Sequence, residues 1–168
     1  MCVTCAKKLV NLNKVSVDML AGPSELAIYS DKTCVPEFVA ADLLSHAEHG
    51  ADSQVVLVAE NKKIISKVIK QLTKQSYLLT RKDIVEQSLS NSQFLVFDKV
   101  KEAFNFLNDY APEHLIIASK KSKKIAKHIK NAGSVFLGNY SSESAGDYAS
   151  GTNHSLPTNG TAKTQSGV

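Results

Sequence analysis

Cysteine is scarce in this chain of 168 residues, and the three that occur, Cys2, Cys5 and Cys34, are an odd number. Small secreted domains instead carry a dense and even set of cysteines that builds a disulfide framework. The sequence is therefore not typical of that class, and a reducing compartment, the cytoplasm, fits it better. Cys2 and Cys5 form a C-x-x-C pair without a second pair to complete a metal site, so we assign the pair no role.

Long apolar runs are also missing. The stretch 54–59 is among the longest, far below the roughly 20 apolar residues that a membrane-spanning helix requires. Charged residues interrupt positions 1–20, where a secretory signal would need an unbroken apolar segment. We therefore expect no membrane partner and no export signal.

A large excess of positive charge is the third feature that the sequence lacks. Its 20 Lys+Arg stand against 16 Asp+Glu, a net charge of +4, which falls short of a nucleic-acid footprint. The stretch 120–130 holds most of the excess, and its spacing around Ile125 and Ile129 predicts a helix with a lysine-rich outer face. It contains no arginine and no aromatic residue. A solvated face is therefore favoured over phosphate or RNA binding, which stays the weaker alternative, and we expect no nucleic-acid partner.

What the sequence does contain is a regular alternation. With 43% hydrophobic and 21% charged residues it has the composition of one globular domain, and short apolar runs alternate with helical patterns. Strands are expected at 26–29, 54–59, 94–97, 115–118 and 134–137, and helices from Pro36 onward, at 62–75, 81–90, about 103–110 and 120–130. The predicted fold class is α/β, with Rossmann-like parallel-sheet layers and flanking helices.

Local signals mark where these elements end. Pro112 disfavours helical geometry at Ala111, so the preceding helix should stop near Tyr110. Gly133 is expected to be the left-handed cap of the lysine-rich helix. Residues 138–168 are rich in Gly, Ser, Thr and Asn, show neither helical nor strand periodicity, and are interpreted as a functional loop.

Histidines are the first candidates for chemistry. Ligands of open α/β sheets collect beyond the carboxyl ends of the strands, so we expect functional groups to converge around that edge. His46 and His49 are three residues apart on one helix, which puts both imidazoles on one face, where they could share a divalent ion. Asp147 and His154 could add ligands that suit zinc. The alternative interpretation is a pair of surface histidines at a helix end.

Glu113 and His114 place a carboxylate and an imidazole side by side at the entry to a buried strand. A histidine titrates near neutral pH, and burial can raise the pKa of a glutamate toward neutral pH. The pair therefore has the residue types that acid-base catalysis uses. Adjacent side chains of a strand point to opposite faces, so both reach one site only if the backbone bends there. Pro112 makes such a bend credible.

Several blocks together carry a resemblance to a known family. They are, in chain order, DMLAGPSE at 18–25, AADLLSHAEHG at 40–50, YAPEHL at 110–115, NAGSVFLG at 131–138 and ESAGDYASGTNH at 143–154. These blocks span nearly the whole chain, and on them the sequence resembles the histidinol dehydrogenases.

The resemblance implies an NAD- and zinc-dependent oxidation of L-histidinol to L-histidine through the aldehyde, at the end of histidine biosynthesis. It implies that Glu113 and His114 are catalytic, the histidine accepting protons and the glutamate activating water. Ser24, His46, His49, His114 and Asp147 would contact the substrate. His46, His49 and Asp147 would bind zinc, which holds the imidazole and amino nitrogens of the substrate.

The sequence departs from the family in one ligand and in length. At the position of His46 the family usually has a glutamine, so an imidazole nitrogen stands where an amide oxygen is expected. Family chains are more than twice as long, so the sequence corresponds to a part of such a chain: the end of the NAD-binding domain at 1–23 and the second half of the zinc- and substrate-binding catalytic domain at 24–168. The NAD-contacting residues would lie outside it.

The resemblance also implies a homodimer, in which a further zinc ligand and a substrate contact come from the partner subunit. The alternative from a different class is a short protein that binds zinc or an imidazole ligand and has no oxidoreductase activity.

Overall fold

A computed structural model of the chain describes residues 5–7, 9–10, 22–151 and 156–164, apart from the side chain of Asp147. Its centre is a five-stranded sheet in the order β3-β2-β1-β4-β5, in which every pairing is parallel. The strands are β1 (Glu25–Ser30), β2 (Gln54–Ala59), β3 (Gln93–Val96), β4 (His114–Ala118) and β5 (Ser134–Leu137). The predicted α/β class and all five predicted strands are confirmed, with bounds shifted by a residue at most.

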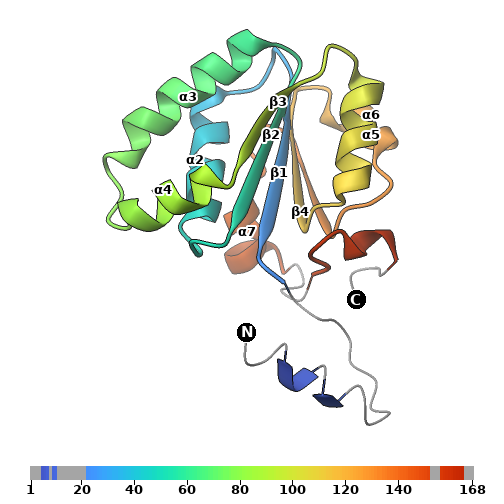
Figure 1. The fold of residues 1–168 in the computed structure, drawn as a ribbon. Coiled ribbons are helices and arrows are strands. Elements are labelled where there is room, and N and C mark those ends of the chain that lie inside the picture. The colour runs from blue at the N-terminus through green and yellow to red at the C-terminus, as the bar shows by residue number, and fades with distance from the viewer. Residues whose placement is uncertain (1–4, 8, 11–21, 152–155, 165–168) are drawn as a thin grey trace.

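Helices cover both faces of the sheet (Figure 1). One face packs against α2 (Pro36–Ala47), α3 (Lys62–Ser76) and α4 (Lys82–Ser90), and the other against α5 (Val100–Tyr110) and the short α6 (Ser122–Ile125). β1 serves both layers, since Leu26 and Ile28 belong to the first core and Ala27 and Tyr29 to the second. A central strand buried on both faces therefore reads as a continuous apolar run rather than an alternating one.

Local sequence explains where these helices begin and end. Pro36 occupies the first turn of α2, where its missing N–H has no partner to lose. The Asn61 side chain accepts a hydrogen bond of 3.2 Å from the backbone N–H of Ile64 and so caps α3. Ala111, which precedes Pro112, adopts a left-handed conformation with φ of 52° and ends α5 at Tyr110, as predicted.

The lysine-rich stretch is wrongly predicted as a helix through residue 130. Only α6 is α-helical there, a 3-10 turn follows at Ala126–His128, and Ile129 is already extended. Lys121 and Lys124 border a hollow of about 420 Å³ at the carboxyl edge of the sheet that the carboxylates of Asp31 and Glu60 also line. The negative charges of these carboxylates offset the positive charges of the lysines. This hollow therefore does not favour binding of a polyanion.

Gly133 is not the left-handed cap that the sequence suggested, since it is absent from the glycines with positive φ. Its role is close packing: a Cβ at this position would lie 2.6 Å from the carbonyl oxygen of Glu113. The Gly133 N–H donates to the Pro112 carbonyl at 3.0 Å, which ties this residue to the segment that leads into β4.

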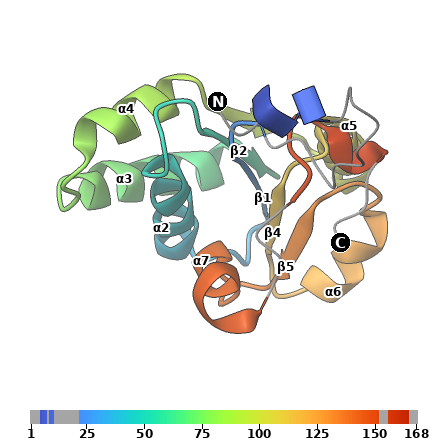
Figure 2. The ribbon, with the colours of Figure 1, turned by 90° about the horizontal axis from the view of Figure 1, so that it is seen from below.

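The expected loop at 138–168 contains short helices in the residues that the structure describes. They are α7 (Glu143–Ala145), a π-helical turn η2 (Gly146–Ser150) and a 3-10 turn η3 (Thr161–Lys163). The prediction of a loop without secondary structure is therefore wrong in part. Seen from below, α7 lies beside α2 and next to the ends of β4 and β5 (Figure 2).

Within the described residues, no helix is long and apolar enough to cross a membrane. Cys5 and Cys34 carry free thiols, and burial raises the pKa of Cys34 to about 11. Cys2, the other half of the C-x-x-C pair, lies outside the described residues.

The packing of α2 on the sheet yields a stability prediction. Leu43 is completely buried in the α2 layer of the core, so Leu43→Ala should lower the free energy of unfolding by about 2–5 kcal/mol. Leu78 is 83% exposed, and Leu78→Ala should change the free energy of unfolding by less than about 0.5 kcal/mol. Urea denaturation followed by circular dichroism measures both values, and equal losses would contradict this assignment of the core.

Candidate active site at the amino edge of the sheet

The predicted site residues that the structure describes meet at the amino edge of the sheet, not at the carboxyl edge that the sequence suggested. Ser24 directly precedes β1, His114 opens β4 and Ser134 opens β5. Helix α2 runs back across the sheet from the end of β1 to the start of β2, so His46 in its last turn reaches the same edge. The predicted location at the carboxyl edge is wrong for two reasons. Ser24 precedes its strand and His114 and Ser134 open theirs, and His46 lies at the end of a helix that returns to the amino edge.

Glu113 and His114 both face this site, as the Pro112 bend predicted. Glu113 lies in a bend just before β4, and its Oε1 is 3.7 Å from the Nε2 of His114. Both side chains are buried. Glu113 Oε2 accepts hydrogen bonds from the Ser24 hydroxyl at 2.7 Å and from the Glu25 N–H at 3.2 Å. The carboxylate is therefore fixed at one oxygen while the other faces the imidazole.

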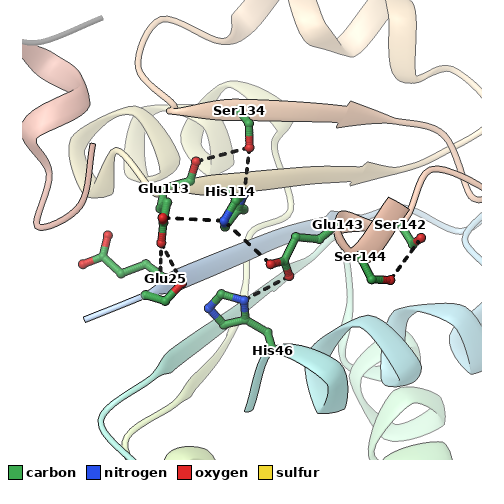
Figure 3. A network of polar contacts seen from close by, with 9 residues as sticks. Glu25, His46, Glu113, His114, Ser134, Ser142, Glu143 and Ser144 are labelled. Atoms are coloured by element: carbon green, nitrogen blue, oxygen red, sulfur yellow. Dashed lines mark hydrogen bonds and ion pairs between the residues drawn. The ribbon is translucent and has the colours of Figure 1, made fainter. Parts of the chain in front are cut away.

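Ser134 sets the orientation of the His114 ring. Its Oγ lies 2.8 Å from His114 Nδ1 and donates a long hydrogen bond of 3.5 Å to the Glu113 carbonyl (Figure 3). A hydroxyl that donates to a carbonyl can accept from the ring, which puts the ring proton on Nδ1. In that tautomer the lone pair of the ring is on Nε2, which lies 3.7 Å from an oxygen of Glu113 and 3.7 Å from an oxygen of Glu143.

His46 and His49 lie together at the end of α2, with ring centroids 5.4 Å apart. His46 is completely buried and its ring centroid is 5.9 Å from that of His114, whereas His49 is exposed. The alternative of a surface histidine pair is therefore wrong for His46. The two side chains remain close enough to share one ion, as their spacing predicted.

Glu143 is a candidate site residue that the sequence analysis missed. This buried carboxylate opens α7 and reaches between two imidazoles, with Oε2 3.0 Å from His46 Nδ1 and Oε1 3.7 Å from His114 Nε2 (Figure 3). It stands in the same sequence block as Asp147, but only the fold brings it to His46, which is 97 residues away in the chain. One potential ligand atom from each of His46, His49 and Glu143 lies within 4.8 Å of the others.

Opposing effects act on the pKa values of two buried carboxylates at this edge, Glu143 and Glu25. Burial pushes the pKa of Glu143 upward, but the hydrogen bond from His46 and the charges of the nearby imidazoles outweigh burial and lower it. Burial raises the pKa of Glu25, against a hydrogen bond from the Asn159 N–H. The imidazoles therefore favour the ionised form of Glu143, whereas burial disfavours the ionised form of Glu25.

The donors present fit a zinc ion. His46 Nε2 is buried and has no hydrogen-bond partner among the described residues, so a polar atom is left for a ligand. Two imidazoles and a carboxylate form a donor set that zinc uses in catalytic sites. Asp147 belongs to η2, but its side chain lies outside the described residues, as does the whole of His154, so their predicted ligation stays a prediction.

Comparison with known proteins places this geometry in context. A family model described as histidinol dehydrogenase matches residues 1–168. A histidinol dehydrogenase of Bacteroides fragilis (strain YCH46) is 55% identical over 166 residues, which are 99% of this chain and 39% of that protein. One of Blochmanniella floridana is 51% identical over 168 residues, 99% of this chain and 38% of that protein. The crystal structure of histidinol dehydrogenase from Elizabethkingia anophelis superposes with a TM-score of 0.95 at 52% identity and covers 99% of this chain and 38% of that one.

A pH-dependent prediction comes from Asp42, on α2 one turn before His46. Burial, and then the nearby charge of Glu143, raise the pKa of Asp42 from 3.8 to about 7. The folded state then binds more protons than the unfolded state between these values, so stability should fall as the pH rises through this window.

Asp42→Asn removes the titrating group, so the free energy of unfolding of this variant should decrease less as the pH rises through the window. Urea unfolding of the metal-free chain at intervals from about pH 4 to about pH 7 measures it. Identical slopes in the original chain and in Asp42→Asn would show that the Asp42 carboxyl titrates normally.

Proposed function

The chain belongs to the histidinol dehydrogenase family, and from that premise we propose that it forms the metal- and substrate-binding part of an enzyme that oxidises L-histidinol to L-histidine. It spans about 39% of the length of the relatives that it matches, so the activity is proposed for the longer protein of which such a segment is part. The observation that carries the proposal is the convergence of Ser24, His46, His49, Glu113 and His114 at one edge of the sheet.

His114 is the proposed proton acceptor. Conversion of the alcohol to the acid passes through two oxidations, and in each a proton leaves an oxygen while a hydride leaves carbon. The Ser134 hydroxyl holds Nδ1, so the proton is taken at Nε2, the atom that faces Glu113 and Glu143. The two carboxylates then stabilise the imidazolium that results.

Glu113 is the proposed base for water. The aldehyde must gain a water molecule before the second hydride can leave, and a carboxylate can take the proton of that water. Ser24 and the Glu25 N–H hold Oε2, which leaves Oε1 directed at His114 and at the site. Glu113 and His114 therefore have different proposed roles, because Ser24 and the Glu25 N–H fix the carboxylate whereas Ser134 fixes the imidazole.

Zinc and NAD are the proposed cofactors. His46 and His49 would hold the zinc together with Asp147, and Ser24, His46, His49, His114 and Asp147 would surround the substrate. Zinc when bound would anchor the nitrogens of the substrate and orient its carbinol, and two NAD molecules would each accept one hydride. The residues that contact NAD are proposed to lie outside this chain.

The proposal includes the organisation of the protein. Residues 1–23 would end the NAD-binding domain and 24–168 would form the second half of the catalytic domain, a boundary that agrees with the start of β1 at Glu25. We place the protein in the cytoplasm as a homodimer whose partner subunit completes the site.

A chimera tests the proposed function. Residues 1–168 would replace the matching segment in the Bacteroides fragilis relative, which is 55% identical there. We expect NADH to form with L-histidinol and NAD, with two NADH for each histidine. A folded, zinc-containing chimera that forms no NADH would overturn the proposal and support the non-catalytic zinc-binding alternative.

Two matched substitutions in the chimera assign the base. His114→Asn should lower kcat by about 10²–10⁴-fold, because it removes a positioned proton acceptor. His128→Asn, a change of the same chemistry at an exposed residue near the carboxyl edge, should leave kcat unchanged. Steady-state NADH formation measures both, and a loss shared equally by the two variants would rule out the specific role of His114.

A further inference from the structure

We propose that Glu143 is a positioning residue that holds the His46 ring so that Nε2, and not Nδ1, binds the metal. The inference rests on the proposed function for the presence of a metal at His46, and it adds which ring nitrogen binds and what selects it. It also concerns the residue at which this chain departs from its family, since His46 stands where a glutamine is usual.

The contacts of the His46 ring divide between its two nitrogens. Nδ1 lies 3.0 Å from Glu143 Oε2, within hydrogen-bond distance, while Nε2 is completely buried and has no partner among the described residues. A buried imidazole nitrogen without a partner costs free energy unless a ligand occupies it. The ring therefore has one nitrogen fixed by protein and one left for an ion.

The carboxylate selects the tautomer. An ionised carboxylate only accepts hydrogen bonds, so Nδ1 must carry the ring proton, and the lone pair is left on Nε2. Carboxylates that accept from the second nitrogen of a metal-bound histidine orient the ring in this way and make it a better ligand.

The position of Glu143 favours this role over direct ligation. Its Oε2 already lies within hydrogen-bond distance of His46 Nδ1, at 3.0 Å, and its Oε1 is turned toward His114 Nε2, 3.7 Å away (Figure 3). One side chain therefore spans the metal-binding histidine and the proton-accepting histidine. A glutamine at position 46 would lack the second ring nitrogen that this arrangement requires.

Cobalt(II), a spectroscopic substitute for zinc, tests the role in the 168-residue chain. Glu143→Ala should weaken cobalt binding by about 10–100-fold, because the ring is no longer held. The visible absorption bands at saturation should stay unchanged, because the ligand set is the same. Glu60→Gln removes a half-buried carboxylate at the opposite edge of the sheet and should leave the affinity unchanged.

Each outcome of this titration bears on a separate claim. Cobalt affinity within twofold of the original chain in Glu143→Ala would overturn the positioning role. A shift or loss of the visible bands at saturation would show that the substitution changes the ligand set, which also contradicts a role confined to positioning. Absence of cobalt binding by the unsubstituted chain would instead contradict the zinc site of the proposed function.

Nitrogen-15 NMR of the metal-free chain gives a second test, and its decisive measurement, on the unsubstituted chain, does not depend on the folding of a variant. We expect the proton of neutral His46 on Nδ1, and in Glu143→Gln a loss of that preference, because the amide can donate to Nδ1 as well as accept from it. A proton on Nε2 in the unsubstituted chain would overturn the inference whatever the metal affinity.

Discussion

The parallel pairing of β1 with β4 is the constraint on which the site depends. It joins segments about 90 residues apart and sets Leu26 beside His114, so that the residues just before each strand meet at one edge. Ser24 and the Glu25 N–H then reach Glu113, and the next pairing sets Ser134 beside His114. The acid-base pair is therefore fixed by backbone registry in three neighbouring strands, and the close approach of Gly133 to the Glu113 carbonyl keeps this edge tightly packed.

Helix α2 and the short α7 add the second half of the site. A fully buried imidazole and a buried carboxylate would each be costly alone, but the hydrogen bond between His46 and Glu143 lowers that cost for both. This contact also attaches α7 to α2, so the polar residues of the site contribute to the placement of the chain after β5. This arrangement leaves His46 Nε2 buried and without a hydrogen-bond partner among the described residues.

Sequence patterns predicted the sheet well because its strands are buried on both faces and appear as unbroken apolar runs. The bend at Glu113 was predictable for a local reason, the proline before it. The structure of the lysine-rich stretch was not predictable in this way, because a helical spacing of two isoleucines also suits a short helical turn followed by extended chain. Gly133 was misread because close backbone approach comes from tertiary packing, which leaves no mark on local sequence.

The candidate site was predictable only in part for the same reason. His46, His49, Glu113 and His114 stand out as adjacent or closely spaced titratable residues, and the family resemblance adds Ser24 and Asp147. Glu143 is four residues before Asp147, but its contact with His46 depends on the packing of α7 against α2, which local sequence does not reveal. The edge of the sheet at which the groups meet likewise followed from the returning path of α2 and not from a rule about strand ends.

The most direct test of the account is to locate zinc in crystals of the zinc-loaded chain by anomalous diffraction at the zinc absorption edge. The account predicts a single strong peak at the amino edge of the sheet, about 2.0–2.1 Å from His46 Nε2 and within bonding distance of His49. A peak elsewhere, or no peak at His46 and His49 in zinc-saturated crystals, would contradict it.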